Sequence, residues 1–351
     1  MDNDQEKNLS QDQPMQTIEN TSSPEENEAI NFNNRIPLDE LKAAVEKLKH
    51  NLSKVIIGQK DFIELLIVGL LADGHVLIEG VPGIAKTVTA KLFAKSIETE
   101  FSRIQFTPDL MPSDVLGTSI LNANSSEFEF KPGPIFSNII LIDEINRAPA
   151  KTQAALFEVM EERQVTIDGK EHKMAPPFMV LATQNPVEQE GTYALPEAQL
   201  DRFIFKIKVD YPSLEEEVLI LQSHHERKQR KPIDILEAVI TPDLLKNYRK
   251  QIHEIVIEEK IINYIAQIVT KTRNHPHLFL GGSPRASISI MNAAKAFAAI
   301  NGRDFVTPED VQKSLNPVLG HRIILTPDKE MEGMSTENVI EMIVKSIEIP
   351  R

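Results

Sequence analysis

The stretch VLIEGVPGIAKT (residues 76–87) determines how the rest of this sequence can be interpreted. A short apolar run leads into a loop that contains Gly80 and Gly83, and Lys86 and Thr87 follow at its end. A strand that turns into a helix in this way exposes successive backbone N–H groups, and the helix dipole adds positive potential beside them. In such a loop the lysine would reach the β- and γ-phosphates of a nucleotide, and the threonine hydroxyl would coordinate Mg²⁺.

One residue departs from the phosphate-loop pattern G-x-x-x-x-G-K-[ST], because Ala85 stands where the pattern has its second glycine. Alanine adds only a methyl group, which is tolerable if this position has a negative φ and the methyl group points away from the phosphates. We therefore predict a negative φ at Ala85. Taken alone, the stretch is also compatible with an ordinary strand–turn–helix connection that carries a surface lysine.

Strand and helix patterns alternate around this loop. Two helices are expected before it, over residues 38–56 and 58–74. Strands are expected over residues 75–80, 102–107, 138–144, 177–185 and 202–209, with helices over 86–97 and 150–162. The apolar runs IILI (139–142) and FMVLA (178–182) do not alternate with polar residues, which is typical of strands covered on both faces. Strands separated by helices predict βαβ units and a parallel sheet.

The pattern changes near Tyr211–Pro212, beyond which amphipathic helices dominate. They are expected over residues 213–226, 241–254, 258–274, 283–301 and 307–315, the last with Thr307 as its N-cap. We therefore expect an α/β domain over residues 35–211, an all-helical domain over 212–330 and a helical C-terminal tail over 331–351. Residues 1–34 carry eight acidic residues against one lysine and few apolar ones, so we expect a disordered acidic tail.

The composition excludes several classes of protein. A net charge of −14 argues against a general affinity for nucleic acid or anionic membranes, because phosphate binding needs clustered Lys and Arg. The absence of cysteine excludes disulfides, thiolate–zinc sites and thiol nucleophiles. No apolar run approaches the roughly 18 residues of a membrane-spanning helix, and the N-terminus has no apolar signal-peptide core. We expect no membrane insertion and a cytoplasmic location.

Polar residues at the ends of the predicted strands indicate a ligand site. Asp143 and Glu144 follow the buried strand 139–142, and acidic residues at this end of a parallel strand suit a ligand crevice. Asp143 can hold Mg²⁺, and Glu144 can polarise an attacking water as general base. Asn185 follows the next strand and could position that water, although a turn residue before proline is the alternative.

The remaining part of a phosphoryl-transfer site is an arginine that stabilises charge on the transferring group. Arg202, before the last strand, and Arg285, at the start of a helix in the second domain, are the candidates. Lone arginines are more often solvated surface residues, so neither position is informative by itself.

These elements, taken in order, resemble the AAA+ ATPases and, within them, the MoxR family. The resemblance covers residues 35–330 and lies in GVPGIAKT (Walker A, where that family commonly has alanine), IILIDEINRAP (Walker B), ATQNP (sensor 1), LPEAQLDRF (arginine-finger segment) and GGSPRA (sensor 2). It implies a three-layer αβα ATPase core followed by an all-helical lid domain, with ATP and Mg²⁺ as ligands. VIIGQ (55–59) is similar to the segment that borders the adenine pocket.

The resemblance also implies the role of each residue. The nucleotide would be bound by Ile57, Gly58, Gln59, Gly80, Val81, Pro82, Gly83, Ile84, Ala85, Lys86, Thr87 and Val88, and the metal by Thr87 and Asp143. Lys86, Glu144, Asn185, Arg202 and Arg285 would be catalytic. Members form rings, generally hexameric, in which Arg202 would act on the neighbour's site. Arg285 would also act across the interface, and action within its own chain is the alternative. Arg147 would lie near the same interface, and a structural ion pair is the alternative.

Two insertions are also similar to the family's pattern. Residues 117–138 resemble its helix-2 insert, and residues 163–178, with the turn pair Asp168–Gly169, resemble its hairpin before sensor 1. In the family these loops contact a client protein, and neighbours often work with a partner that carries a von Willebrand type A domain. From sequence alone they are two exposed β-turn segments.

We therefore expect an ATPase that hydrolyses ATP in a homo-oligomeric ring and remodels, matures or activates a protein partner. The alternatives are a motor that acts on nucleic acid and a nucleotide switch or scaffold that does not hydrolyse. The charge of −14 weighs against the first. The presence of Glu144, Asn185 and Arg202 weighs against the second. A phosphate-loop kinase would need an acceptor-binding lid, which the helical second domain does not suggest.

Overall fold

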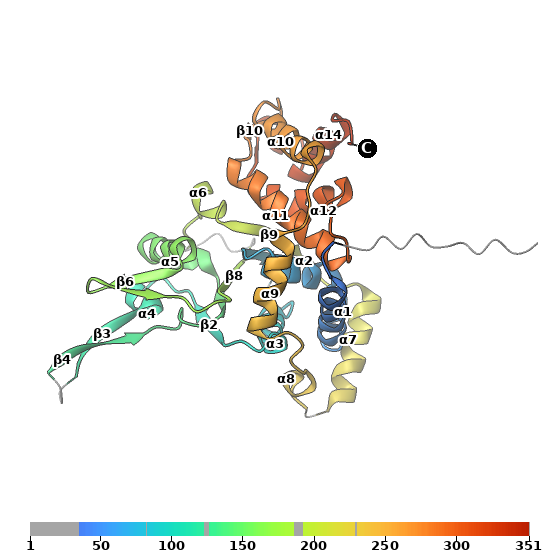
Figure 1. Ribbon diagram of the computed structural model, residues 1–351. Helices are drawn as coiled ribbons and strands as arrows, with labels where there is room; N and C mark the ends of the chain where they lie inside the picture. Colours follow the sequence, from blue (N-terminus) through green and yellow to red (C-terminus); the bar gives the residue numbers. More distant parts are fainter. Residues whose placement is uncertain (1–34, 82, 123–125, 186–191, 229, 351) are drawn as a thin grey trace, which may run out of the picture. The chain divides into compact units, whose positions relative to one another are not determined.

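The computed structural model describes residues 35–81, 83–122, 126–185, 192–228 and 230–350. The predicted acidic tail (1–34) and the nucleotide-binding position Pro82 lie outside the described residues. In the N-terminal half, five strands of the described chain form one parallel sheet in the order β2-β5-β8-β1-β9. Their bounds are β1 (His75–Gly80), β2 (Phe101–Gln105), β5 (Ile139–Asp143), β8 (Met179–Gln184) and β9 (Phe203–Val209). Figure 1 labels β2, β8 and β9 of this sheet. The predicted parallel α/β fold is confirmed.

Alternate residues of the central strands enter two different hydrophobic cores, which makes the sheet the middle of three layers. Ile139 and Leu141 of β5 pack on one side, into a core that includes α1 (Asp39–Ser53), α2 (Lys60–Leu71) and α3 (Lys86–Ser96). Ile140 and Ile142 pack on the other side, with α4 (Pro112–Leu116) and α5 (Ala150–Glu162). Burial of both faces explains why these strands read as continuous apolar runs.

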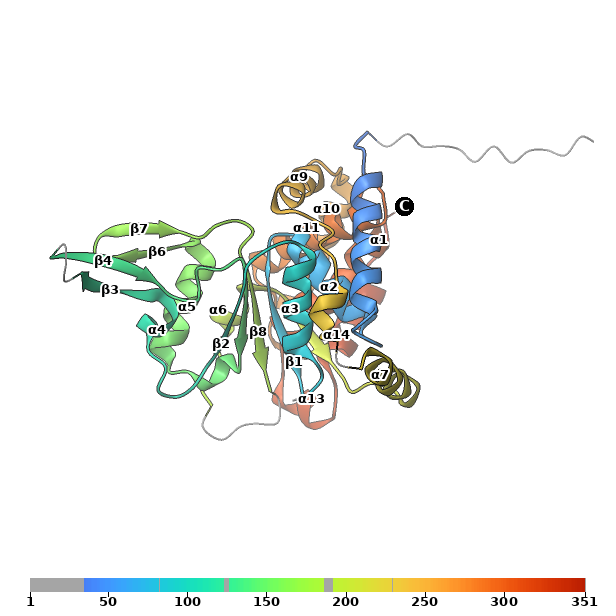
Figure 2. The same cartoon turned by 90° about the horizontal axis from the view of Figure 1, so that it is seen from below.

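Two β-hairpins project from the α5 side of the sheet (Figure 2). The first consists of β3 (Gly117–Asn122) and β4 (Glu127–Pro132), and the second of β6 (Gln164–Ile167) and β7 (Lys170–Lys173). Asp168 and Gly169 have φ of 51° and 76° and so form the tight turn that their sequence predicts. The connection after β5 is a short 3₁₀ helix, η1 (Ile145–Arg147), and α6 (Glu197–Leu200) precedes β9.

The C-terminal half is dominated by helices, as predicted. They are α7 (Leu214–Arg227), α8 (Pro232–Ile235), α9 (Pro242–His253), α10 (Glu259–Arg273), α11 (Pro284–Ile300), α12 (Pro308–Leu319), α13 (Pro327–Met331) and α14 (Thr336–Lys345). Thr307 takes the N-cap position of α12 as expected, and its backbone N–H donates a hydrogen bond to the Asp310 carboxylate at 3.0 Å. The core that contains α1 and α2 continues into α10, α11 and α12, so this half packs directly on the sheet domain.

Three details of this half differ from the sequence-based expectation. It is not all-helical, because β10 (Leu278–Leu280) and β11 (Ile324–Leu325) pair antiparallel, and strands of two or three residues are too short to show a period of two. The helix that begins after Thr307 continues through Pro317 to Leu319. The C-terminal segment is helical as expected, but α14 packs on α10 and α12 instead of extending as a tail.

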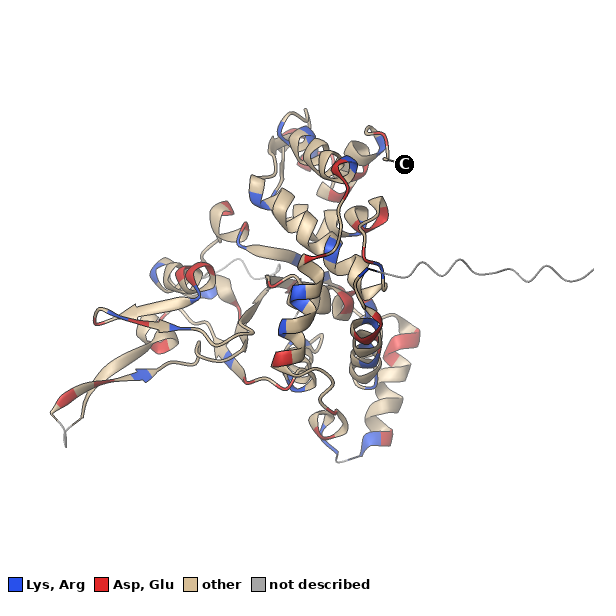
Figure 3. Ribbon diagram, viewed as in Figure 1, with Lys and Arg blue, Asp and Glu red and all other residues tan. Residues whose placement is uncertain are grey.

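Charges are interspersed over both halves of the ribbon (Figure 3). Within the described ranges, no helix is long and apolar enough to span a bilayer.

Candidate active site

The predicted phosphate loop connects β1 to α3, and Lys86 is the first residue of the helix. The Lys86 ammonium donates a hydrogen bond of 2.5 Å to the Gly80 carbonyl, so the side chain folds back across the loop. Partial burial lowers the pKa of Lys86, and the negative charges of Asp143 and Glu144 oppose that shift. The loop therefore contains a cation that lies beside two carboxylates and at the N-terminus of a helix, where anions are favoured.

Ala85 does not have the predicted backbone conformation. Its φ is 63° and its ψ 19°, which is the left-handed region, so the prediction of a negative φ was wrong. The connection from the extended β1 to the helix α3 uses positive φ at two described positions, 89° at Gly83 and 63° at Ala85. For alanine this conformation costs about 1–2 kcal/mol, which explains why the general pattern has glycine at this position.

Asp143 ends β5 and is only 7% exposed. One carboxylate oxygen accepts a hydrogen bond from the Arg103 Nε at 2.6 Å, and the other accepts one from the Thr183 hydroxyl at 3.3 Å. Arg103 lies on β2, which pairs with β5. A buried carboxylate fixed in this way presents an oxygen ligand at the edge of the sheet that carries the phosphate loop.

Glu144 takes the next position and has a left-handed backbone, with φ of 57°. Its N–H donates to the Thr183 hydroxyl at 3.0 Å. Its Oε2 atom accepts a hydrogen bond from the Gln105 side-chain amide at 2.7 Å and forms an ion pair of 3.1 Å with Arg147. Both contacts are made to this one oxygen, at the end of the sheet where the parallel strands have their carboxyl ends.

Arg103 and Gln105 were not among the site residues predicted from sequence. Both lie on β2, and the parallel register places Gln105 opposite Asp143. The available signal was the alternation of polar residues in SRIQ (102–105), which points two polar side chains to the same face of a strand.

Asn185 directly follows β8 and is buried. β8 lies between β5 and β1, and its last residues pair with Ile78 and Glu79 of β1. Asn185 therefore lies at the same sheet edge as Asp143, Glu144 and the phosphate loop.

The segment expected beside the adenine contacts the phosphate loop directly. The Gln59 side-chain amide donates to the Ile84 carbonyl at 3.1 Å. A cavity of about 380 Å³ opens here, between residues 58–62, the carboxyl end of β9 with residues 210–212, and Glu216 of α7. Ile57, Val81 and Thr87 are half-buried, Ile84 is buried, and Gly83 and Val88 are exposed. The cavity is adjacent to the loop because Gly80 pairs with Val209.

The two candidate arginines lie at the opposite end of the sheet, where the parallel strands have their amino ends. The β1–β9 register places Gly80 beside Val209 but His75 beside Phe203, the residue after Arg202. Strand β1, which connects these two ends of the sheet, is about 20 Å long at the usual rise per residue. Arg202 donates to the Phe157 carbonyl at 2.8 Å and contacts Glu161 at 3.2 Å, and Arg285 forms an ion pair with the same Glu161 at 2.5 Å. The structure brings the arginines together, away from the phosphate loop of their own chain.

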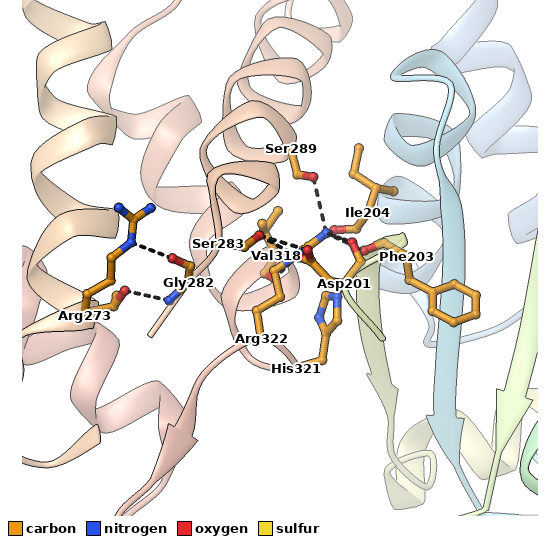
Figure 4. Close-up of polar contacts among 11 residues, drawn as sticks. Asp201, Phe203, Ile204, Arg273, Gly282, Ser283, Ser289, Val318, His321 and Arg322 are labelled. Carbon is orange, nitrogen blue, oxygen red and sulfur yellow. Dashed lines mark hydrogen bonds and ion pairs between the residues drawn. The ribbon is translucent and has the colours of Figure 1, made fainter. Parts of the chain in front are cut away.

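A polar cluster around Asp201 joins the segments that carry the two arginines (Figure 4). The buried Arg322 donates from Nε to the Asp201 carboxylate at 2.7 Å and also donates to the carbonyls of Phe203 and Ile204. The Ser283 hydroxyl, at the start of α11, donates to both oxygens of Asp201 at 3.0 and 2.9 Å. Strand β9, which follows Arg202, and helix α11, which carries Arg285, are therefore fixed to each other.

Comparison with known proteins shows the family of this chain. The family model described as "ATPase family associated with various cellular activities (AAA)" matches residues 75–205, and the AAA lid domain matches residues 270–343. Chaperone MoxR1 of Mycobacterium tuberculosis is 43% identical over 316 residues, which cover 88% of this chain and 82% of that protein. The chain belongs to the MoxR family of AAA+ ATPases.

Other relatives of this MoxR-family chain extend over nearly its whole described length. The uncharacterized protein YeaC of Bacillus subtilis is 46% identical over 312 residues, 89% of this chain and 97% of that protein. A crystal structure of a proposed ATPase from Cytophaga hutchinsonii superimposes with a TM-score of 0.82 at 41% identity, over 89% of this chain and 97% of the other.

Proposed function

We propose that this MoxR-family chain hydrolyses ATP in a Mg²⁺-dependent reaction, at sites shared between neighbouring copies of a ring. We also propose that it uses this reaction to remodel a protein client. The observation that supports a shared site most strongly is the separation of Arg202 and Arg285 from the phosphate loop of their own chain. An arginine at that distance can stabilise a transferring phosphoryl group only if the nucleotide belongs to another copy. We propose a hexamer as the assembly.

The residues of the phosphate loop are suited to hold the nucleotide. Lys86 and the N–H groups that precede α3 would bind the β- and γ-phosphates, and the cavity beside Gly58 and Gln59 would take the base. Among the described residues no cluster of three or more His, Asp or Glu side chains forms a metal cage. Mg²⁺ that is bound together with a nucleotide needs only one or two carboxylates besides the phosphates, so Asp143 and the Thr87 hydroxyl fit it. When bound, the ion would neutralise charge on the phosphates.

Glu144 is the proposed general base. It would accept a proton from a water molecule whose oxygen forms a bond to the γ-phosphorus while the bond to the leaving ADP oxygen breaks. Asn185 lies at the same sheet edge and would orient that water. Lys86 of the same chain, and Arg202 and Arg285 of the neighbour, would stabilise the charge that develops on the phosphoryl oxygens.

The two hairpins are the proposed client-contacting surface. Ile120, Leu121 and Phe128 on β3–β4 are 48%, 55% and 73% exposed. The hairpins support each other, since the rings of Phe130 and His172 lie 4.2 Å apart. The name of MoxR1 as a chaperone favours a protein client, and we propose that this client carries a von Willebrand type A domain.

The proposal is tested with two variants and the wild-type chain. The wild type should hydrolyse ATP with Mg²⁺, Glu144→Gln should bind ATP without turnover, and Lys86→Ala should lose nucleotide binding by calorimetry. Affinity capture with Glu144→Gln in ATP should retain a client, while Lys86→Ala in the same buffer should not. Wild-type turnover by Glu144→Gln, or unchanged ATP affinity of Lys86→Ala, would contradict the assignment.

A further inference from the structure

Glu161, in the last turn of α5, contacts both candidate arginines with one carboxylate. Its Oε1 accepts from Arg285 at 2.5 Å, and its Oε2 pairs with Arg202 at 3.2 Å. The two arginines come from segments that are more than 80 residues apart in sequence, one before β9 and one at the start of α11. Neither the sequence patterns nor the family resemblance assigned a role to this glutamate.

The location of Glu161 is unfavourable for the helix itself. The last four residues of α5 are Val159, Met160, Glu161 and Glu162, so two negative charges lie at the negative end of the helix dipole. Such charges are disfavoured there by a few tenths of a kcal/mol or more. The partners of Glu161 are solvent-accessible, and exposed ion pairs add only about 0–1 kcal/mol to stability. Stability therefore does not account for a glutamate at this position.

The surrounding contacts do define the positions of the arginines. Arg202 also donates to the Phe157 carbonyl, and Phe157 and Glu161 are four residues apart on one face of α5. Asp201, next to Arg202, is tied to Ser283, which lies two residues before Arg285. Asp201 thus fixes the backbone segments, and Glu161 fixes the guanidinium groups.

We infer that Glu161 is a positioning residue, which holds Arg202 and Arg285 as an oriented pair for the nucleotide of the neighbouring copy. This inference rests on the proposed function. Two guanidinium groups repel each other, and a carboxylate between them offsets this repulsion while each oxygen orients one group. The pair with Glu161 keeps a net positive charge, so it remains attractive to phosphate. Glu161 itself does not touch the reacting atoms and acts only through the arginines.

The test introduces Glu161→Gln either into the subunit that offers the arginines or into the subunit that binds ATP at the shared site. A donor subunit carries Lys86→Ala, so it offers arginines but has no working site of its own. An acceptor subunit carries Arg202→Ala and Arg285→Ala, so it binds ATP but offers no arginines. The two chains are co-expressed with different tags and purified through both, so that only mixed assemblies are assayed. The restored ATP hydrolysis is then compared with Glu161→Gln on the donor, with Glu161→Gln on the acceptor and with Glu162→Gln on the donor.

Glu161→Gln on the donor should lower the restored kcat by about tenfold, since misplaced catalytic groups cost one to two orders of magnitude. The KM for ATP should stay unchanged. The same change on the acceptor should have no effect, and neither should Glu162→Gln, which removes the same charge from the same helix end. An equal loss on donor and acceptor, or no loss on the donor, would overturn the role of Glu161 but leave the shared site intact. Mixed assemblies that restore no hydrolysis would overturn the shared site, and the role of Glu161 with it.

Discussion

The Gln105 side-chain amide donates a hydrogen bond of 2.7 Å to the Glu144 carboxylate. The two residues are 39 positions apart and meet because β2 pairs with β5 in parallel register. A residue of the neighbouring strand therefore contacts the proposed base, and Arg147 forms an ion pair with the same carboxylate oxygen.

Gln105→Ala should lower kcat for ATP hydrolysis by about tenfold, because it removes one hydrogen bond to the charged Glu144 carboxylate. The KM for ATP should change little, because the Gln105 side chain forms its hydrogen bonds with Glu144 and Arg103 and not with the described residues of the phosphate loop. Ser102→Ala, on the same strand, is the control, since that hydroxyl donates a hydrogen bond to the Pro134 carbonyl. Equal kcat values for Gln105→Ala and the wild type would show that the contact does not orient the base.

Ala85→Gly should stabilise the protein slightly. Glycine relieves about 1–2 kcal/mol of left-handed strain in the folded state. It also favours the unfolded chain by about 0.4–1 kcal/mol through that chain's greater conformational entropy. We therefore expect the free energy of unfolding to rise by about 0.5 kcal/mol. Nucleotide affinity should be retained. Ala85→Val should be destabilised and bind ATP more weakly, because a β-branched residue is disfavoured at positive φ. Urea unfolding and calorimetry check both variants. A glycine variant less stable than the wild type would contradict the strain at Ala85.

The pair of Asp201 and Arg322 should contribute strongly to folding. Arg322 is 6% exposed, so Asp201→Ala would leave its charge buried without a carboxylate. We expect a loss of about 3 kcal/mol, seen as a lower midpoint in urea. Asp201→Asn keeps an oxygen acceptor for Ser283 and should lose less. If both variants unfold at the wild-type midpoint, the cluster does not join the two halves of the chain.

We expect His75 to lower the free energy of unfolding as the pH falls below neutrality. Its Nδ1 accepts from the Val180 N–H at 3.0 Å, so its Nε2 carries the proton and donates to the Met160 carbonyl at 3.1 Å. Burial lowers the pKa of His75 to about 4. Above pH ~6.5 the imidazole is neutral in both states and pH has no effect through it. Between about 6.5 and 4 the unfolded chain binds the proton and the folded chain does not, so stability decreases as pH falls, by about 3 kcal/mol in all.

His75→Gln isolates this contribution, because glutamine can donate and accept but does not titrate. From pH 7.5 to 5.0 the wild type should lose about 2 kcal/mol more unfolding free energy than the variant. The buried His321, whose pKa is also lowered by desolvation, is common to both proteins and cancels in the comparison. Equal losses in the two proteins would exclude His75 as the cause.

Local sequence signals predicted the elements that carry the site. The apolar runs of β5 and β8 indicated buried strands because both faces of these strands are covered. The predicted span of α5 (150–162) is the observed one, and Asp168–Gly169 makes the predicted turn. The carboxyl edge of a parallel sheet then predicted that Lys86, Asp143, Glu144 and Asn185 would meet.

Features that depend on contacts between distant segments could not be predicted. The contacts of Gln105 and Glu161 form only because of strand register and because the C-terminal half packs on the sheet. The backbone of Ala85 was predicted wrongly because the residue's size was considered, whereas the connection from β1 to α3 sets its φ. The strands β10 and β11 are too short for any periodic signal.

The dependence of ATPase activity on protein concentration tests the central claim, a site built from two copies, most directly. Specific activity of the wild type should be constant while assemblies persist, and should fall steeply on dilution to concentrations where mass photometry detects single chains. The loss should be reversed by concentrating the sample. Constant specific activity in solutions that contain only single chains would contradict a shared site.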